Sequence, residues 1–216
     1  MRSSLFVFKI MRTITAIEAQ KRRRDRVNVF LDGAFAFSLG IEVVGERGLH
    51  LGQALTDSQI EELERANLFQ KCLNAALRFL SHRPRSEAEI RTRLRRGFEG
   101  ETIDRVLLQL KARGMIDDAA FAEFWREDRE SFSPRSRMLL KLELRRKGVD
   151  PELVGDVLEG IDEEESAYRA AQRRVRLLTR EDQDTFKRKL GPFLRRRGFS
   201  YEVINRVIER LWQERD

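Results

Sequence analysis

The stretch Pro84-Arg85-Ser86 recurs 50 residues later as Pro134-Arg135-Ser136, and this recurrence decides the fold. The same shift brings apolar residues of three successive segments into register without a gap. Self-similarity at a fixed period indicates a repeat architecture. The aligned sets are Ile90, Leu140 and Leu190; Leu94, Leu144 and Leu194; Ile103, Leu153 and Val203; Leu107, Val157 and Val207; and Leu108, Leu158 and Ile208.

Each 50-residue repeat is expected to contain three helices. The positions equivalent to Ile90 and Leu94 are one helical turn apart, so they share a buried face. A turn with a glycine ends that helix, and positions 103, 107 and 108 form the buried stripe of the next helix. A further helix precedes each pair, over roughly 68–81, 118–131 and 163–178. The turn glycines are Gly97, Gly148 and Gly198.

The segment before the repeats has the period-two pattern of β-strands. Residues 14–19, 27–31 and 34–38 are the expected strands, and Asp32-Gly33 is a two-residue hairpin turn. About three strands are too few to be stable alone, so this sheet should pack against helices. Thr56-Asp57-Ser58-Gln59 matches a capping box, which predicts a helix start there, with Leu55 and Ile60 placed as a hydrophobic staple.

These patterns predict a mainly α fold of three tandem three-helix repeats, with a small N-terminal antiparallel hairpin or three-strand element. Residues 1–12 are expected to be a disordered leader, and residues 13–67 a β-rich extension with a helix. The repeats are assigned to residues 68–117, 118–161 and 162–216. Residues 1–10 carry no capping or pairing signal and should be dispensable.

The composition indicates a basic protein with a core. The chain has 43 Lys and Arg against 36 Asp and Glu, a net charge of +7, and 41% apolar residues. No apolar run approaches the ~18 residues of a membrane span. The opening residues offer only a short apolar core and no cleavage site for a signal sequence, so we expect a cytoplasmic protein. We also expect a monomer.

An arginine pair follows each inward leucine of the aligned helices, at Arg95-Arg96, Arg145-Arg146 and Arg195-Arg196. In a helix these residues lie about 100° and 200° from the leucine, off the core face. Stacked repeats would align them in a basic row suited to bidentate contact with phosphate or carboxylate. The last turn of a helix also favours cations, by a few tenths to ~1 kcal/mol, so both roles stay open.

Other basic residues flank these pairs or form a separate hairpin tip at residues 22–24, which could equally be an exposed turn. The candidate binding residues for a protein partner or nucleic acid are Arg22, Arg23, Arg24, Arg85, Arg95, Arg96, Arg135, Lys141, Arg145, Arg146, Lys147, Lys187, Arg188, Lys189, Arg195, Arg196 and Arg197.

No residue pattern indicates catalysis, a cofactor or a metal. Cys72 is the only cysteine and fits a packed helical position. The chain has no Walker-type phosphate loop and no Cys/His cluster for zinc. Asp117-Asp118 resembles a carboxylate pair, but N-capping of the next helix explains it. The aromatic group at Phe121, Phe124 and Trp125 is expected in the core. We therefore expect a binding protein and not an enzyme.

Three stretches carry a family resemblance: Arg83-Pro84-Arg85-Ser86-Glu87-Ala88-Glu89-Ile90, Gly97-Phe98, and Gly114-Met115-Ile116-Asp117-Asp118-Ala119-Ala120-Phe121-Ala122. They are similar to the first repeat of the RecX family of RecA-recombinase regulators. The resemblance covers residues 70–214, and the β-rich start resembles the extension of the longer members. The third repeat departs from this resemblance, with Asp184-Thr185-Phe186 in place of Pro-Arg-Ser.

The resemblance implies an elongated all-helical crescent that docks into the groove of a RecA–DNA filament. It implies a regulator in homologous recombination, DNA repair and the SOS response that inhibits the recombinase, ATPase and co-protease activities of RecA. The implied partners are the RecA filament and single- or double-stranded DNA. Two alternatives stay open: a nucleic-acid-binding module that acts without a recombinase, and a repeat scaffold for another acidic protein.

Overall fold

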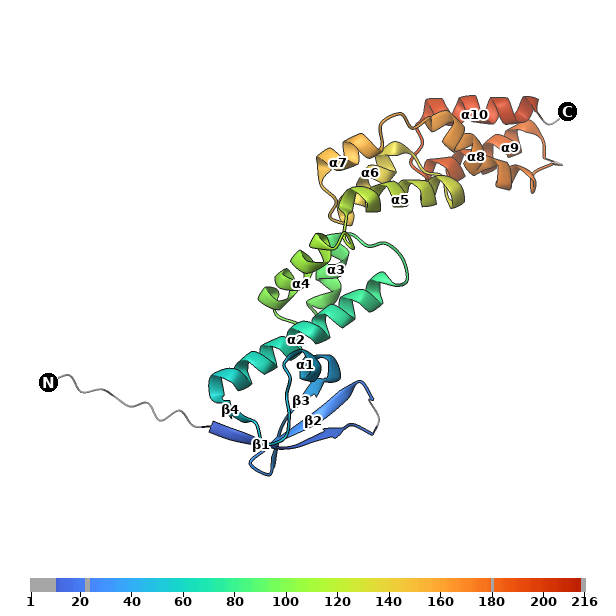
Figure 1. Cartoon of the computed structure of the whole chain (residues 1–216). Helices are drawn as coiled ribbons and strands as arrows, with labels where there is room; N and C mark the ends of the chain where they lie inside the picture. The colour runs from blue at the N-terminus through green and yellow to red at the C-terminus, as the bar shows by residue number, and fades with distance from the viewer. Residues whose placement is uncertain (1–10, 22–23, 180, 215–216) are drawn as a thin grey trace. The chain divides into compact units, whose positions relative to one another are not determined.

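The computed structural model describes residues 11–21, 24–179 and 181–214 (Figure 1). The chain forms two compact units. The first comprises the residues up to His82 together with Thr92–Leu110, and the second comprises Arg83–Arg91 together with Lys111–Asp216. Residues 1–10 of the expected leader 1–12 lie outside the described residues, as do the candidate residues Arg22 and Arg23. Met11 and Arg12, which were also assigned to the leader, belong to the first strand of the sheet.

The first unit begins with an antiparallel sheet of order β3-β2-β1-β4. The three expected strands are present, and the Asp32-Gly33 turn has the positive φ values, 51° and 84°, that this hairpin type requires. A fourth strand, which the sequence pattern did not indicate, pairs its three residues with Met11–Thr13. The strands are β1 (Met11–Ala19), β2 (Arg26–Leu31), β3 (Ala34–Gly40) and β4 (Ala54–Thr56).

One face of this sheet packs against helices. Val27, Val29 and Leu31 of β2 alternate inward and form a core with Leu63 of α2 (Asp57–Leu80). The short helix α1 (Ile41–Glu46) follows β3 directly. The predicted capping box at Thr56 is present and starts α2, which runs without a break through the expected helix start near residue 68. The sheet and the first repeat therefore share one long helix.

The three predicted repeats are confirmed as three groups of helices. The second half of α2, with α3 (Glu87–Leu94) and α4 (Gly100–Ala112), makes the first. The second consists of α5 (Asp118–Phe132), α6 (Arg137–Arg146) and α7 (Pro151–Val157). The third consists of α8 (Glu163–Val175), α9 (Gln183–Arg195) and α10 (Tyr201–Gln213).

With the exception of Leu108, the aligned apolar positions lie in the core or, for the partly buried Leu153, pack against it. The residues aligned with Ile90, Leu94 and Leu107 are buried in all three repeats. Leu158 and Ile208 are also buried, but Leu108 is 70% exposed, so its predicted inward position is wrong. The buried side of α4 is made by Val106, Leu107 and Leu110, and Leu108 lies about 100° further round the helix.

Hydrogen bonds between helix ends join successive repeats. The start of α3 contacts the end of α6, and the start of α6 contacts the end of α9. The Ser86 hydroxyl accepts a hydrogen bond from the Glu89 amide (3.1 Å) and donates one to the Lys147 carbonyl at the end of α6 (2.6 Å). Likewise the Ser136 amide donates to the Arg197 carbonyl beyond the end of α9 (2.9 Å). Each joint therefore satisfies a carbonyl that the helix end would leave without a partner.

Two glycines make room for these joints. Gly148 and Gly198 have φ values of +77° and +85°, which side chains disfavour. A Cβ on Gly148 would lie 2.3 Å from the Cβ of Ala88, and one on Gly198 would lie 2.4 Å from Oγ of Ser136. Gly97, their expected counterpart in the first repeat, has neither a positive φ nor any atom within 4 Å of a Cβ. The close approach of a preceding repeat, and not the turn alone, requires glycine.

The third repeat replaces the serine of the joint with a core residue. Phe186 occupies the position of Ser86 and Ser136, is fully buried, and meets Trp212 edge to face at 5.4 Å. The Asp182 side chain caps α9 in place of a serine. The absence of Pro-Arg-Ser in this repeat is therefore explained by packing inside the repeat.

Candidate functional site: basic side chains of the repeats

The arginine pairs lie on the surface at helix ends in all three repeats. Arg145 and Arg146 form the last turn of α6, Arg195 ends α9, and Arg96 follows the end of α3. All six side chains are exposed, and within the described part of the chain none of them has an ion-pair partner. They are therefore placed both to stabilise their helix ends and to meet a partner. Arg95 and Arg96 belong to the first unit and the other four to the second, so a single row remains a prediction.

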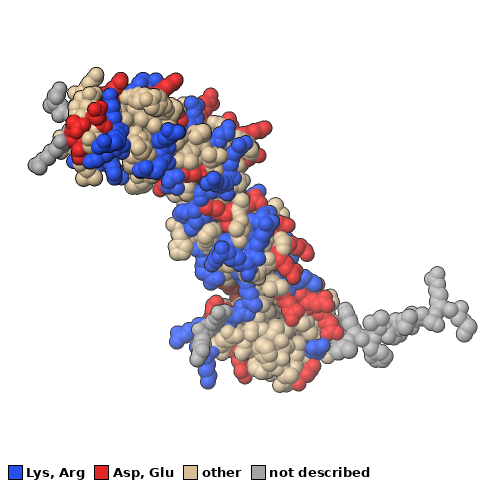
Figure 2. Space-filling model, turned by 180° about the vertical axis from the view of Figure 1, so that it is seen from behind, with Lys and Arg blue, Asp and Glu red and all other residues tan. Residues whose placement is uncertain are grey.

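Most of the flanking candidates are also exposed. Arg24, Lys141, Lys187 and Arg188 lie on the surface, while Lys189 pairs with Glu181 at 2.6 Å. Figure 2 shows Lys and Arg side chains gathered over the helical part of the chain, with fewer acidic side chains between them.

Two candidates, Arg135 and Lys147, are instead engaged in ion pairs inside the second unit. Lys147 Nζ lies 2.7 Å from Glu89 and 3.9 Å from the centroid of the Trp125 ring. Arg135 pairs with Glu143, which also accepts a hydrogen bond from the Trp125 indole N–H. A partner would have to break these pairs, so these two cations are better placed to join helices than to bind.

Around Trp125 these charges form a layer between the first two repeats. Arg129 lies 4.2 Å and Arg83 5.6 Å from the ring centroid, so with Lys147 three cations surround one indole. Burial raises the pKa of Glu89, but hydrogen bonds from Arg83 and Lys147 outweigh it and hold that pKa below its ordinary value. Of the aromatic group expected in the core, Phe121 is buried and Trp125 is partly buried.

The two adjacent aspartates cap helices, as predicted for the pair. Asp117 accepts hydrogen bonds from the Ala119 and Ala120 amides and starts α5. Asp118 reaches a second helix, accepting from the Glu87 amide at 2.8 Å, and burial raises its pKa. Both carboxylates are therefore occupied by backbone donors.

The remaining candidates for chemistry are the Cys72 thiol and side chains that could bind a metal ion. Burial raises the pKa of the Cys72 thiol to about 11, so it stays protonated near neutral pH. Among the described residues, no group of three or more His, Cys, Asp and Glu side chains could hold a metal ion. No helix in the same residues is both long and apolar enough to cross a membrane.

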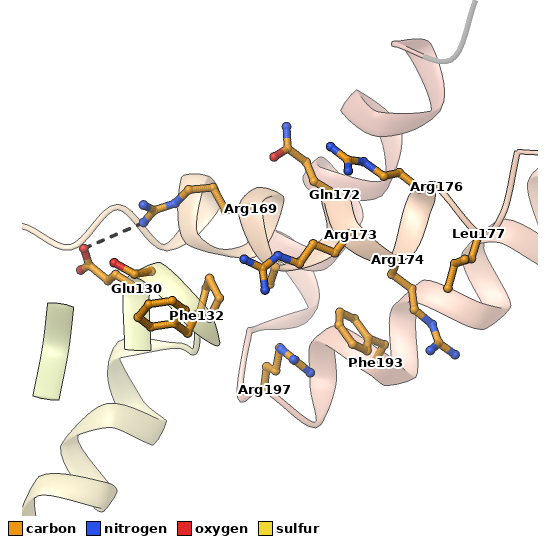
Figure 3. Close-up of a pocket in the computed structure, with 13 residues that line it drawn as sticks. Glu130, Phe132, Arg169, Gln172, Arg173, Arg174, Arg176, Leu177, Phe193 and Arg197 are labelled. Atoms are coloured by element: carbon orange, nitrogen blue, oxygen red, sulfur yellow. Dashed lines mark ion pairs between the residues drawn. The ribbon is translucent and has the colours of Figure 1, made fainter. Parts of the chain in front are cut away.

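The structure also reveals a basic pocket, which the sequence analysis missed. It has a volume of about 710 Å³ and lies where the end of α5 meets α8 and α9. In Figure 3 the Arg173 and Arg197 side chains point toward the space between Phe132 and Phe193. Five arginines and one glutamate line it: Arg169, Arg173, Arg174, Arg176, Arg197 and Glu130. The local signals were the i,i+4 spacing of Arg169 and Arg173 and the arginine-rich run Arg173-Arg174-Val175-Arg176.

Charge in the basic pocket is poorly compensated. Glu130 lies 3.9 Å from Arg169, and no other carboxylate of the described residues pairs with a pocket arginine. Arg197 stacks on Phe193 at 4.1 Å, and its Nε is buried without a hydrogen-bond partner among the described residues. Burial and the neighbouring Arg196 lower the pKa of Arg197. An anion in the basic pocket would relieve this repulsion.

Four family models match the chain in sequence order. The regulatory protein RecX N-terminal domain matches residues 12–56, and the first three-helix domain of RecX matches residues 72–110. The second and third three-helix domains of RecX match residues 117–158 and 162–208. The matched ranges follow the sheet and the three helical repeats.

Relatives with known names and structures agree with these models. The chain is 34% identical over 207 residues to regulatory protein RecX of Clostridium perfringens, covering 93% of this chain and 97% of the relative. It is 32% identical to regulatory protein RecX of Listeria welshimeri, with 88% and 72% covered. A crystal structure of regulatory protein RecX matches with a TM-score of 0.65 at 26% identity, covering 92% and 99% of the two chains. The structure of RecX from Lactobacillus salivarius matches with a TM-score of 0.56 at 25% identity, covering 68% and 97%.

Proposed function

The chain belongs to the RecX family, and from this membership we propose that it binds the RecA–DNA filament and inhibits the recombinase, ATPase and co-protease activities of RecA. The proposed action is binding without chemistry, by a monomer in the cytoplasm, with DNA of the filament as a second contact. The chain itself should hydrolyse no nucleotide.

One observation carries the proposal: each repeat presents an exposed arginine pair at the same helix end. A RecA filament is a helical assembly of identical subunits, so equivalent side chains on successive repeats could meet equivalent groups on successive subunits. Several weak contacts of this kind give tight binding in combination when the geometry allows all of them to form at the same time. Guanidinium groups suit both phosphate and carboxylate acceptors on such a surface.

The test is the ATPase rate of RecA on single-stranded DNA, titrated with the purified chain, together with a strand-exchange assay. We expect both activities to fall at or below an equimolar ratio, and no ATP turnover by the chain alone. Unchanged RecA activity under conditions where filaments form would contradict the proposal. ATP hydrolysis that follows the chain through size-exclusion chromatography would contradict its non-catalytic part.

A further inference from the structure

The basic pocket lies within the second unit, and none of the six paired arginines lines it. Four of its five arginines have no carboxylate partner among the described residues, and an exposed aromatic ring lies at its wall. We propose that the basic pocket binds an unpaired stretch of single-stranded nucleic acid, with arginines on phosphates and Phe132 against a base. This inference rests on the part of the proposed function that names DNA as a partner, and it assigns a site for it.

The arginines account for the phosphate part of the ligand. Arg197 and Arg174 lie 4.1 Å and 5.7 Å from the centroid of the Phe193 ring, so this ring supports two guanidinium groups. A guanidinium carries only donors and a phosphate only acceptors, so the two match without any protein acceptor in the site. The volume of about 710 Å³ lies within the range of about 300–1,000 Å³ typical of ligand sites.

Phe132 accounts for the base. It is the last residue of α5, and its side chain is 70% exposed at the edge of the basic pocket. Single-stranded nucleic-acid sites combine a basic groove with aromatic rings on which bases stack. A paired base has both faces covered by its neighbours in the duplex, so an unpaired strand fits this ring better than double-stranded DNA.

An acidic peptide fits the basic pocket less well. A peptide needs partners for its own backbone amides and carbonyls. Most residues that line the basic pocket belong to helices, whose internal amides are already bonded within the helix, and none of its lining residues belongs to a strand. A phosphodiester backbone has no such donors to satisfy.

The test measures binding of a short fluorescein-labelled oligothymidylate by fluorescence anisotropy, without RecA, over a series of salt concentrations. The variant Arg173→Gln/Arg176→Gln should weaken binding and flatten its salt dependence, by a slope of about 0.7 for each lost phosphate contact. Phe132→Ala should weaken binding by about five- to a hundredfold, because one stacked base is lost. For an abasic strand of the same length, Arg173→Gln/Arg176→Gln should bind more weakly than the wild type, whereas Phe132→Ala should bind as the wild type does.

The matched control is Arg113→Gln/Arg137→Gln, which removes the same charge from exposed positions of the same unit outside the basic pocket. It should bind nearly as the wild type does, and circular dichroism should show that all variants keep their helices. The inference is overturned if the wild type does not bind the oligonucleotide, if the control loses as much affinity as the pocket variant, or if a duplex or polyglutamate binds more tightly.

The assay separates this inference from the proposed function because it contains no recombinase. A chain that binds the oligonucleotide through the basic pocket but leaves the RecA ATPase unchanged would support this inference and contradict the inhibitory function. A chain that inhibits RecA but binds no oligonucleotide would support the inhibitory function and contradict this inference.

Discussion

At the scale of single residues, the joint between the first two repeats depends on the missing side chain of Gly148. A Cβ there would overlap the Ala88 Cβ, at a φ that side chains disfavour. Overpacking and strain of this kind cost about 1–3 kcal/mol. Gly155, in α7, has a helical backbone and nothing within 4 Å of a Cβ.

We therefore predict that Gly148→Ala lowers the free energy of unfolding by about 1–3 kcal/mol. The control Gly155→Ala should raise it by about 0.5–1 kcal/mol, as expected for alanine in a helix. Urea denaturation followed by tryptophan fluorescence measures both, since Trp125 and Trp212 both lie in the second unit. Equal stability of Gly148→Ala and the wild type would show that the joint is looser than described.

Glu89 should make the second unit sensitive to acid. Its pKa lies below the ordinary value of 4.5 because the hydrogen bonds from Arg83 and Lys147 outweigh burial. Its stabilising contribution is therefore present above about pH 4.5 and is lost as the pH falls through the lowered pKa.

The predicted result is a stability difference between the wild type and Glu89→Gln that is largest near neutral pH and shrinks below about pH 4. The raised pKa of Asp118 has the opposite effect on stability, but it is common to both proteins and cancels in the difference. Urea denaturation at several pH values checks this. A difference that stays constant down to pH 3 would mean that Glu89 is not held ionised by its partners.

At the scale of helices, successive repeats meet through hydrogen bonds and an ion pair between the ends of their helices. The Ser86 hydroxyl both caps α3 and satisfies the Lys147 carbonyl. Ser200 offers a comparison, because its hydroxyl caps α10 and its one described hydrogen bond is to the Val203 amide.

Ser200→Ala should therefore cost about 1 kcal/mol, the usual loss for an N-cap. Ser86→Ala should cost about 1–3 kcal/mol more, because a carbonyl in the joint loses its donor. Thermal and urea denaturation of the two variants compare these costs. Equal losses would mean that the hydrogen bond between repeats adds nothing to the cap.

How far the sequence predicts these elements depends on the range of the signal. Periodicity and caps act within a few residues, so the three repeats, the Asp32-Gly33 turn and the start of α2 were predicted correctly. β4 pairs with residues more than forty positions earlier, and its three residues carry no pattern of their own. The outward position of Leu108 depends on which side of α4 meets its neighbours, which spacing alone does not determine.

The same limit applies to the candidate site. Exposure of the arginine pairs follows from their angle to an inward leucine, and it was predicted. The internal ion pairs of Arg135 and Lys147 depend on Glu143 and Glu89, and the Glu89 contact joins separate repeats. The basic pocket combines the end of α5 with α8 and α9, so only the packing of the second repeat on the third creates it.

At the scale of the whole molecule, function is expected to depend on charge repeated along the chain. An arginine that only stabilises a helix end contributes a few tenths to ~1 kcal/mol to folding and nothing to binding. Arginines that contact a repeating partner contribute additively, because stacked repeats present equivalent groups. The two roles predict different outcomes when the pairs are removed one after another.

The most direct measurement is the affinity of the chain for preformed RecA filaments on single-stranded DNA, by co-sedimentation at fixed salt. The series is the wild type, Arg145→Gln/Arg146→Gln, and the variant with all six paired arginines changed to glutamine. We predict a graded loss of affinity across the series, while circular dichroism shows an intact helical fold in each protein. Filament binding by the six-fold variant that equals that of the wild type would contradict the account.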